Sequence, residues 1–436
     1  MMTDQTEIHR VVIIGGGFGG LNAAKALRNA PVKITLIDKR NLHLFQPLLY
    51  QVATGGLSPA DIASPIRAIL RKNKNTRTIM AEVKDIDIES QQVFMDDDRV
   101  ADYDSLIVAA GSRHHYFGHD DWSRYAPGLK TIEEALEIRR RILSAFEKAE
   151  LTEDDTTRRQ LLTFVIVGGG PTGVELAGTV GEITRYTIGR EYSSFDLKTA
   201  RIILVEGQTR ILPAFDQKLS AKATKSLEEL GVEVLSGSMV TSIDRNSITL
   251  VINDGIETIK TDTVLWAAGV KASSLGRIIA KNNLSWLDSS ERVIVDSRMS
   301  LPGHDNVFVI GDLANYSHQT GEPLPGLAPV AIQQGKYVAK LIKAKLTNKT
   351  VRPFRYVDKG NLATIGRSRA VGQIGNLKVS GLFAWLVWLF VHLMYLVGFE
   401  NRLLVFIQWA WNYFTWNRSA RIITNVTTIP DEKPKI

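Results

Sequence analysis

The sequence has 436 residues, too many for one ordinary domain, and predicts two or three units. Its 44% hydrophobic and 23% charged residues are typical of a globular chain and indicate neither disorder nor a polytopic membrane protein. The net charge of +7 is compatible with attraction to an anionic membrane surface, and no run of like charges forms an arm that would bind nucleic acid. The lack of cysteine excludes disulfide frameworks, Fe–S clusters, Cys-ligated zinc and CxxC pairs.

The N-terminal region predicts a βαβ unit. Met1–Arg10 is polar and carries no signal-peptide pattern, so we expect the catalytic body in the cytoplasm. A buried strand at Val11–Ile14 is followed by a glycine turn, a helix over Leu21–Asn29 and a strand over Lys33–Asp38.

The glycine turn fits a dinucleotide fingerprint. Gly15-Gly16-Gly17-Phe18-Gly19-Gly20 matches G-x-G-x-x-G directly between the strand and the helix. The first glycine permits a tight turn, the second lets the backbone approach a pyrophosphate, and the third allows close helix packing. Asp38 ends the next strand, where a carboxylate accepts hydrogen bonds from a ribose. An ordinary glycine-rich turn is the alternative, and the matching strand, helix and Asp disfavour it.

The same order of elements then returns. A strand over Ser105–Ala110 ends in Gly111, a helix follows over Ile132–Glu150, and Leu151–Arg159 has the composition of a polar linker. Phe164–Val167 opens a second strand, glycine turn and helix. The chain therefore contains an internal repeat of a nucleotide-binding unit.

The second fingerprint is Gly168-Gly169-Gly170-Pro171-Thr172-Gly173, before a helix over Val174–Thr179. Its acid is Glu206, after the strand Arg201–Val205, and the long gap indicates an insertion around Ile188–Lys198. A carboxylate at this place repels the 2′-phosphate of NADP and favours NADH. Arg210 lies close enough in the sequence to weaken that preference for NADH, but Glu206 outweighs it because it occupies the position at the end of the strand.

Two fingerprints imply two dinucleotides. A third strand-like run, Asn306–Asp312, precedes a helix over Val330–Leu346, and its Ile310-Gly311-Asp312 resembles the second FAD motif of two-dinucleotide flavoproteins. In those proteins FAD occupies the N-terminal fingerprint and the nicotinamide cofactor the inserted one. Leu106–Gly111 and Val264–Gly269 are similar to their connecting strands.

The chemistry expected is hydride transfer from nicotinamide C4 to flavin N5, which needs no nucleophilic side chain. Glu175 lies on the first turn of the second nucleotide helix, where it either contacts the nicotinamide ribose or amide or complements the helix dipole. The predicted cofactor-binding residues are Gly15, Gly17, Phe18, Gly20, Asp38, Lys39, Ala110, Gly111 and Asp312 for FAD, and Gly168, Gly170, Thr172, Gly173, Glu206 and Gly269 for NADH.

The histidines His114, His115 and His119 invite comparison with a metal site. No carboxylate or further histidine completes a recognisable ligand spacing, so we expect no metal.

The last part of the chain predicts membrane attachment. Leu382–Phe399 is almost uncharged, and Leu403–Trp416 is rich in tryptophan with one polar stripe. This is an interfacial pattern, with rings at headgroup depth, although the first segment alone also fits a short membrane span. We favour attachment without crossing, on a bilayer surface contacted by residues 380–425. The stripe is Gln408, Asn412 and Thr415, and the charged residues are Lys378, Arg402, Arg418 and Arg421 against Glu400.

Over residues 8–425 the sequence resembles the type II NADH:quinone oxidoreductases, non-proton-pumping NADH dehydrogenases. The resemblance rests on three stretches: 167–178 around the second fingerprint, 45–53 (FQPLLYQVA) and 328–335 (APVAIQQG). It implies NADH oxidation through tightly bound FAD with two-electron reduction of a membrane quinone. It further implies peripheral attachment at the cytoplasmic face of the membrane and leaves a homodimer open.

The resemblance also implies a quinone site. Ala328 to Gln333 looks like the A-x-x-x-x-Q signature of the family, with Pro329 where many members have a second glutamine. From the residues alone, Gln333 is an ordinary helix N-terminal residue that bonds to local backbone. The predicted catalytic residues are Glu175 and Gln333, and the predicted quinone contacts are Gln333, Gln334, His392 and Tyr395; for His392 and Tyr395 the alternative is a polar tip on an interfacial helix.

The fold class expected is α/β, with two Rossmann-like dinucleotide-binding domains and a C-terminal amphipathic helical module. The domains predicted are FAD-binding over 1–120 and 296–350, a helical connection over 121–162, NADH-binding over 163–295 and membrane attachment over 351–436. A soluble ferredoxin or rubredoxin reductase and a non-catalytic redox sensor are the alternatives. Sulfide:quinone reductases and disulfide reductases need cysteines that this chain lacks.

Overall fold

The computed structural model describes residues 8–188, 191–253, 255–416, 418 and 420–423. These residues form two compact units, each made of three chain segments. Unit 1 contains 8–44, 63–114 and 270–359, and unit 2 contains 45–62, 115–269 and 360–423. Parts of three predicted segments lie outside the described residues, namely 1–7 of the N-terminus, 189–190 of the insertion, and 417, 419 and 424–425 of the lipid-contacting range.

Unit 1 is built on a six-stranded sheet in the order β20-β21-β9-β1-β2-β5. Five strands run parallel, and the short edge strand β20 is antiparallel. Apolar residues of β1 and β9 are fully buried in its core, as expected for a parallel sheet covered on both faces. The strands are β1 (His9–Ile14), β2 (Val32–Asp38), β5 (Thr76–Met80), β9 (Ser105–Val108), β20 (Ser300–Leu301) and β21 (His304–Val309).

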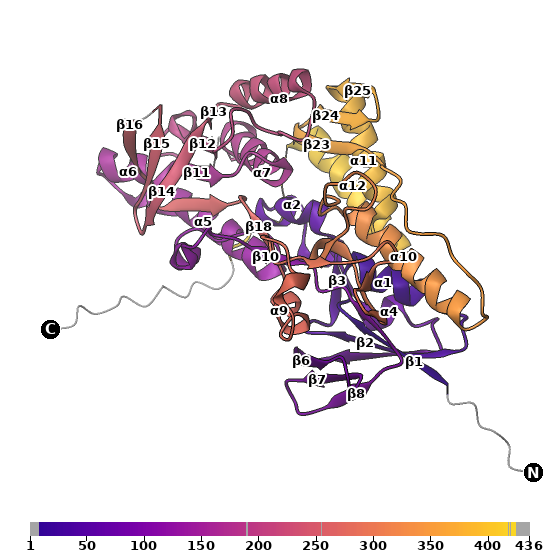
Figure 1. Cartoon of the computed structure of the whole chain (residues 1–436). Helices are drawn as coiled ribbons and strands as arrows, with labels where there is room; N and C mark the ends of the chain where they lie inside the picture. Colours follow the sequence, from indigo (N-terminus) through magenta and orange to yellow (C-terminus); the bar gives the residue numbers. More distant parts are fainter. Residues whose placement is uncertain (1–7, 189–190, 254, 417, 419, 424–436) are drawn as a thin grey trace, which may run out of the picture. The chain divides into compact units, whose positions relative to one another are not determined.

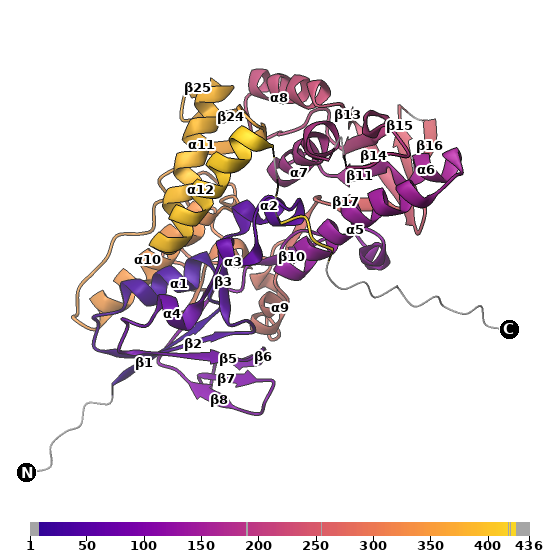
Figure 2. The same cartoon turned by 180° about the vertical axis from the view of Figure 1, so that it is seen from behind.

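Two helices of unit 1, α1 (Phe18–Ala26) and α10 (Ala328–Lys345), lie side by side (Figures 1 and 2). They cross closely, since a Cβ on Gly335 would lie 2.2 Å from the carbonyl oxygen of Gly19. The remaining elements of the unit are β3 (Leu42–Leu44), β4 (Ala63–Pro65), α4 (Ile66–Ile69), β6 (Val83–Asp87), β7 (Gln92–Met95), β8 (Val100–Asp102), β10 (Ser112–His114), β18 (Val270–Ala272), α9 (Leu275–Ile279), β19 (Val293–Ile294) and β22 (Ala314–Asn315).

Unit 2 repeats the nucleotide-binding arrangement with a four-stranded parallel sheet in the order β13-β12-β11-β17. A three-stranded antiparallel sheet, β14-β15-β16, follows β13 in the chain. The strands are β11 (Thr163–Val167), β12 (Arg201–Glu206), β13 (Val232–Ser236), β14 (Ser238–Asp244), β15 (Ser247–Ile252), β16 (Gly255–Lys260) and β17 (Thr263–Trp266), and the helices are α2 (Leu49–Ala53), α3 (Pro59–Ile62), α5 (Ile132–Leu151), α6 (Asp155–Leu161), α7 (Pro171–Glu182) and α8 (Gln217–Glu229).

Helix α5 has the bounds that the sequence predicts to within one residue. A capping box starts it, in which Thr131 accepts from the Glu134 amide while the Glu134 side chain accepts from the Thr131 amide. The linker expected at Leu151–Arg159 is wrong in its second half, because α6 begins there. The Asp154 carboxylate caps α6 by accepting from the Thr157 amide, and a short polar helix of this kind lacks an apolar periodicity.

The C-terminal part of unit 2 consists of a small antiparallel sheet followed by two helices. The sheet is formed by β23 (Asn361–Gly366), β24 (Arg369–Ile374) and β25 (Leu377–Ser380). Helices α11 (Leu382–Tyr395) and α12 (Phe399–Thr415) lie side by side, in yellow (Figures 1 and 2). Exposed large apolar side chains line both helices, namely Leu382, Phe383, Leu386, Phe390 and Met394 on α11 and Leu403, Leu404, Phe406, Ile407, Trp411 and Phe414 on α12. Among the described residues, none of the helices combines the length and the apolar composition that a membrane span requires.

Candidate active site

The first fingerprint forms a tight turn between β1 and α1. Gly15 has a φ of +99°, and a Cβ there would lie 2.4 Å from the carbonyl oxygen of Ala109. Gly20 is packed even more closely, because its Cβ would lie 1.9 Å from the carbonyl oxygen of Gly15. Gly17 has nothing within 4 Å of such an atom, so the backbone stays open at the helix N-terminus. One open glycine between two packed ones is the cradle that a pyrophosphate requires.

The second fingerprint repeats this geometry between β11 and α7. Gly168 has a φ of +111°, and its Cβ would lie 2.7 Å from the carbonyl carbon of Ala267. A Cβ on Gly173 would lie 1.8 Å from the carbonyl oxygen of Gly168, whereas one on Gly170 would meet nothing within 4 Å. The chain therefore carries the same phosphate cradle twice, once in each unit.

Each cradle is held by the acid that ends its second strand. Asp38 accepts a hydrogen bond of 2.6 Å from the Gly16 amide, and Glu206 accepts one of 2.6 Å from the Gly169 amide. Burial raises the pKa of Asp38, and the amides of Gly16 and Arg40 partly offset that shift. The two acids thus occupy equivalent places, beside the second residue of each turn, where an adenosine ribose lies in this fold class.

The third motif lies in unit 1 as well. The Ser112 hydroxyl donates to the Asp312 carboxylate over 2.7 Å, across 200 residues of sequence. Gln334 is buried, with 1% of its surface exposed, and its side-chain oxygen accepts from the Gly311 amide over 2.7 Å. Asp312, Asp38 and the open Gly17 together fit an FAD in unit 1. Gln334 therefore fixes the turn that carries Asp312.

Gln333 is bound to the backbone at both ends of its amide. Its side-chain nitrogen donates to the Val357 carbonyl over 2.9 Å, and its oxygen accepts from the Val357 amide over 3.0 Å. This is the backbone-bonding alternative considered for the residue, although the partner lies 24 positions away and not in the same helix. Pro329 lies in the first turn of α10, where the missing N–H costs nothing.

Glu175 lies on α7 and is buried, with 8% of its surface exposed. Burial raises its pKa to about 8, and the Thr364 backbone and the Trp388 side chain offset only part of that shift. A carboxyl with this pKa is mostly protonated at pH 7. It therefore carries little charge to complement the helix dipole, which weighs against that alternative.

Two comparisons of sequence bear on this geometry. The model of the pyridine nucleotide-disulphide oxidoreductase family matches residues 9–335, and that of the NDH2 C-terminal domain matches residues 359–416. The type II NADH:quinone oxidoreductase Ndh of Mycobacterium tuberculosis is 46% identical over 424 residues, which cover 96% of this chain and 90% of the relative. The type II NADH:quinone oxidoreductase of Staphylococcus haemolyticus is 30% identical over 387 residues, covering 85% and 91%.

The chain belongs to the type II NADH:quinone oxidoreductase family.

Solved structures share the fold of this type II oxidoreductase. NDH2 from Plasmodium falciparum in complex with NADH matches with a TM-score of 0.87 at 20% identity, covering 96% of this chain and all of the other. The sulfide:quinone oxidoreductase of Aquifex aeolicus matches with a TM-score of 0.70 at 19% identity, covering 95% and 92%. The α/β fold with a C-terminal helical module, predicted from the sequence, is confirmed.

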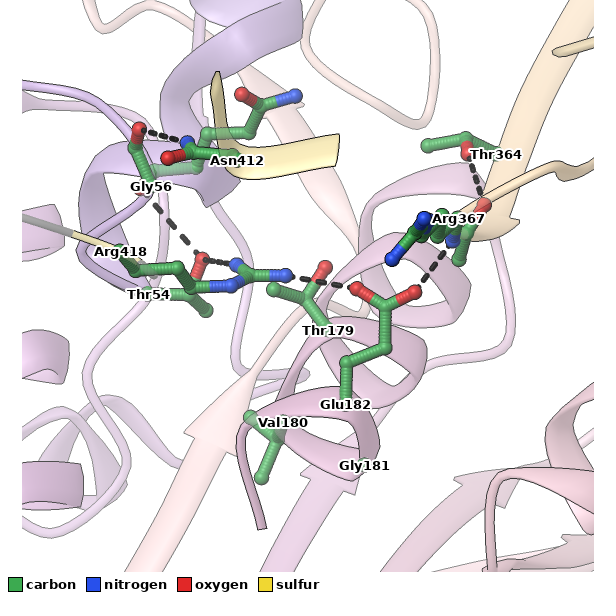
Figure 3. Close-up of polar contacts among 12 residues, drawn as sticks. Thr54, Gly56, Thr179, Val180, Gly181, Glu182, Thr364, Arg367, Asn412 and Arg418 are labelled. Atoms are coloured by element: carbon green, nitrogen blue, oxygen red, sulfur yellow. Dashed lines mark hydrogen bonds and ion pairs between the residues drawn. The ribbon is translucent and has the colours of Figure 1, made fainter. Parts of the chain in front are cut away.

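In this type II oxidoreductase the C-terminal module packs on the second nucleotide helix. The Glu182 carboxylate at the end of α7 accepts from the Arg418 guanidinium over 2.7 Å and from the Arg367 amide (Figure 3). Arg418 also donates to the Thr54 hydroxyl over 3.3 Å. A Cβ on Gly178 would lie 1.7 Å from the carbonyl oxygen of Ile365, so α7 and β23 are in direct backbone contact.

Exchange of Glu182 for glutamine is expected to destabilise the fold by about 3 kcal/mol, because it leaves the buried Arg418 without its anion. Arg418 and Glu182 expose only 14% and 8% of their side chains. The matched control is Glu233→Gln, whose pair with Arg201 is exposed at 45% and 39% and should contribute less than about 1 kcal/mol. The melting temperatures of the two variants test this prediction, and an equal shift of the melting temperature in both would contradict it.

The cations predicted to face lipid are instead largely engaged within the protein. Arg418 binds Glu182, Arg421 binds Glu191 over 2.6 Å, and Lys378 binds Asp216 over 2.5 Å. Arg402 donates to the Leu396 carbonyl over 2.8 Å. The expected net positive surface is therefore weaker than the sequence count implies.

Asn412 of the polar stripe and part of the tryptophan set also face inward, whereas Thr415 of the stripe is exposed. The Asn412 amide donates to the Gly56 carbonyl over 3.3 Å (Figure 3), and the Trp409 indole donates to the Gln51 side chain over 2.7 Å. Trp409 and Trp388 are buried and pack with ring centroids 5.4 Å apart. The expectation that the rings of Leu403–Trp416 lie at headgroup depth is therefore wrong for Trp409, whereas Trp411 is exposed at 62%.

His392 packs into the protein. Its Nδ1 lies 2.7 Å from the Trp388 carbonyl, its ring stacks on Trp388 at 4.3 Å, and Phe45 meets it edge-on at 6.3 Å. Burial lowers its pKa to about 4, so the ring is neutral at physiological pH. Tyr395 is exposed at 41%. A cavity of about 110 Å³ in unit 2 is lined by Trp385, Trp388, Trp409, Tyr413 and other residues, and neither His392 nor Tyr395 is among them.

The three histidines considered for a metal lie in different surroundings. His119 stacks on Trp122 with ring centroids 4.2 Å apart, and His115 contacts the Phe117 ring at 4.6 Å. His114 belongs to β10 in unit 1. The described residues contain no group of three or more metal-ligating side chains.

Several site residues have no signal in the sequence. His43 is buried, and its Nδ1 lies 2.9 Å from the Gly16 carbonyl within the first turn. Ser112 joins Asp312, and the Arg367 guanidinium stacks on Tyr413 at 4.1 Å. A lone histidine or serine without periodicity gives no reason to single it out, because each partner is distant in the sequence.

Proposed function

We propose that this chain oxidises NADH through bound FAD and reduces a membrane quinone, with the predicted residues in the roles given below. When bound, FAD would supply the chemistry, accepting the hydride of NADH and passing two electrons to quinone, which takes up two protons to become quinol. The observation that carries the proposal is the duplicated cradle, with Gly17 open in unit 1 and Gly170 open in unit 2. Two such cradles in one chain bind a cofactor and a second dinucleotide as its reductant.

The residues around each cradle bind and orient. Asp38 with Lys39 and Phe18 binds the FAD adenosine half, and Asp312 with Ala110 and Gly111 binds its ribityl side. Glu206, Thr172 and Gly269 bind NADH, and no side chain needs to act as a nucleophile.

Selectivity for NADH over NADPH rests on Glu206 and on the engagement of Arg210. The Arg210 guanidinium donates to the backbone carbonyls of Phe215 over 2.8 Å and Pro213 over 2.7 Å. It is therefore held by its own loop and is not presented to a 2′-phosphate. The Glu206 carboxylate repels that phosphate, which makes NADH the preferred reductant.

We propose Gln333 in unit 1, and His392 and Tyr395 in unit 2, as quinone contacts. Gln334, predicted as a further contact, has 1% of its surface exposed and accepts from the Gly311 amide, so we propose that it acts only by ordering that turn. Because backbone groups use both ends of the Gln333 amide, that residue orders the segment around Val357. A quinone carbonyl accepts a hydrogen bond from the second N–H of the Gln333 side-chain nitrogen, whose other N–H donates to the Val357 carbonyl.

Membrane attachment is proposed through the exposed apolar row of α11 and α12. Tyr395 apart, eleven large apolar side chains are exposed among the residues of these two helices whose burial the structure describes, and an apolar patch of this kind marks an interaction site. Such a row suits the headgroup and acyl boundary of the cytoplasmic leaflet. It also argues against a soluble ferredoxin or rubredoxin reductase, whose carrier needs no bilayer.

The test is a visible spectrum of the purified protein before and after additions. We expect an oxidised flavin spectrum that NADH bleaches under anaerobic conditions and that a short-chain quinone restores, with NADPH much slower. The protein should also sediment with anionic vesicles. A flavin that NADH leaves oxidised would refute the enzyme proposal, and failure to sediment would refute the attachment alone.

A further inference from the structure

Phe117 is an exposed aromatic side chain on a strained backbone. It has a φ of +53°, and 59% of its surface is exposed. The residue that follows, Gly118, has a φ of +96°. A bulky residue in the left-handed region is uncommon, and such outliers gather at functional sites.

The ring of Phe117 is held against the loop that follows β17. A Cβ on Gly269 would lie 2.7 Å from Cζ of Phe117 and 2.9 Å from the carbonyl oxygen of His115, so a larger residue there would have to displace both the ring and the backbone. The His115 amide donates to the Gly269 carbonyl over 3.3 Å, and the Trp266 indole donates to the His115 carbonyl over 3.2 Å. Gly269 itself has a φ of +66°. The Gly269 loop and the Phe117 ring therefore pack directly against each other.

The Gly269 loop and the Phe117 ring lie at the point where the strand order of unit 2 reverses. The chain runs from β11 to β12 and β13 on one side of the sheet and returns to β17 on the other side of β11. In open parallel sheets ligands bind outside the carboxyl ends of the strands at such a point. The turn at Gly168 and the loop from Ala267 are its two walls, since a Cβ on Gly168 would lie 2.7 Å from the Ala267 carbonyl carbon.

The order of the strands gives the direction of the bound dinucleotide. Glu206 at the end of β12 marks the adenosine ribose, and the open Gly170 after β11 marks the pyrophosphate. Continuing in the same direction, the next loop is that of Gly269 after β17, with the Phe117 ring upon it. The nicotinamide half of the dinucleotide must therefore extend toward Phe117.

We propose that Phe117 is a positioning residue for the nicotinamide half of NADH. The inference rests on the function proposed above and deepens it. An exposed ring beside a glycine whose φ of +66° disfavours any side chain offers an apolar face to the planar nicotinamide and its ribose. That face fixes the orientation of the half that gives up the hydride and excludes water from one side of it.

The experiment compares Phe117→Ala with Phe117→Tyr in the FAD-loaded protein. The probes are NAD⁺, which carries the nicotinamide, and ADP-ribose, which lacks it, both titrated by calorimetry. We expect alanine to weaken NAD⁺ binding about tenfold and ADP-ribose binding less than twofold, and tyrosine to restore NAD⁺ binding. Anaerobic flavin reduction by NADH should need an about tenfold higher NADH concentration for half its maximal rate in the alanine variant.

The matched control is Ile256→Ala, which removes another exposed apolar side chain of the same unit, 78% exposed on β16. It should change neither titration. Equal loss of both ligands in Phe117→Ala, or no loss of either, would overturn the inference. Should the alanine variant not fold, Phe117→Leu, which keeps the apolar bulk without the ring, takes its place with the same outcomes. Failure of the wild type to be bleached by NADH would refute the proposed function, whereas the two titrations judge Phe117 without turnover.

Discussion

Exchange of Gly173 for alanine is expected to reduce NADH-driven flavin reduction at least about hundredfold while FAD stays bound. The added Cβ would lie 1.8 Å from the carbonyl oxygen of Gly168, which is backbone and cannot move aside. Helix α7 must then retreat from the turn, and the amides that face a pyrophosphate lose their positions. FAD has its own cradle around Gly17 in unit 1, so the visible spectrum of the variant should be unchanged.

The control is Gly170→Ala in the same turn. A Cβ there meets nothing within 4 Å, so the melting temperature should stay at the wild-type value. The methyl group nevertheless occupies the space that the pyrophosphate needs, and the KM for NADH should rise. Gly173→Ala, in contrast, should lower the melting temperature as well. Wild-type NADH oxidation in Gly173→Ala would show that the second fingerprint does not bind the reductant.

The duplicated cradle could be predicted from the sequence because all its determinants are local. Glycines at fixed spacing, a buried strand before them and an acid at the end of the next strand lie within about forty residues. The structure adds the hydrogen bonds from Gly16 to Asp38 and from Gly169 to Glu206. Helix bounds were less accurate, since α1 begins at Phe18 and α7 extends to Glu182, beyond the apolar pattern in each case.

The packing of the C-terminal module could not be predicted in this way. The amphipathic sequence of α12 is compatible with Asn412 facing lipid headgroups and equally with Asn412 facing the Gly56 carbonyl. The choice between the two depends on which surface covers the helix, and that is a property of the fold. Ion pairs raise the same difficulty, because Arg418 and Glu182 are 236 positions apart. A charge count treats such residues as free, and only the fold shows that they are partnered.

Glu175 is predictable in one respect and not in another, because its position depends on a local motif and its environment on distant residues. Its place on the second nucleotide helix follows from the fingerprint, although α7 begins at Pro171, so Glu175 lies beyond the first turn where the sequence predicts it. Its burial comes from residues near Thr364 and Trp388, far along the chain. The sequence therefore predicts the position of Glu175 but not its protonation state. That state follows from desolvation, which disfavours the charged form of a carboxyl.

The melting temperature of Glu175→Gln is expected to exceed that of the wild type by an amount that grows from pH 5 to pH 8. The folded-state pKa of about 8 lies above the ordinary value of 4.5, so the folded protein holds a proton that the unfolded chain has released. The contribution of Glu175 to wild-type stability is then greatest below pH 4.5 and falls by up to about 1.4 kcal/mol per pH unit until about pH 8. Glutamine carries no titrating proton, so the variant escapes this loss, which amounts to about 3.5 kcal/mol between pH 5 and pH 8 because the slope flattens near each pKa.

A matched exchange at Glu150 separates this effect from the general consequence of removing a carboxylate. Hydrogen bonds from the Ser194 amide and the Ser193 hydroxyl hold the pKa of Glu150 below its usual range, so it is ionised throughout pH 5 to 8. The offset between Glu150→Gln and the wild type should therefore be flat over that interval. Thermal unfolding followed at half-unit steps of pH compares the two variants. A flat offset for Glu175→Gln would mean that the carboxyl is ionised in the folded protein, and a buried cation would then be needed to hold it.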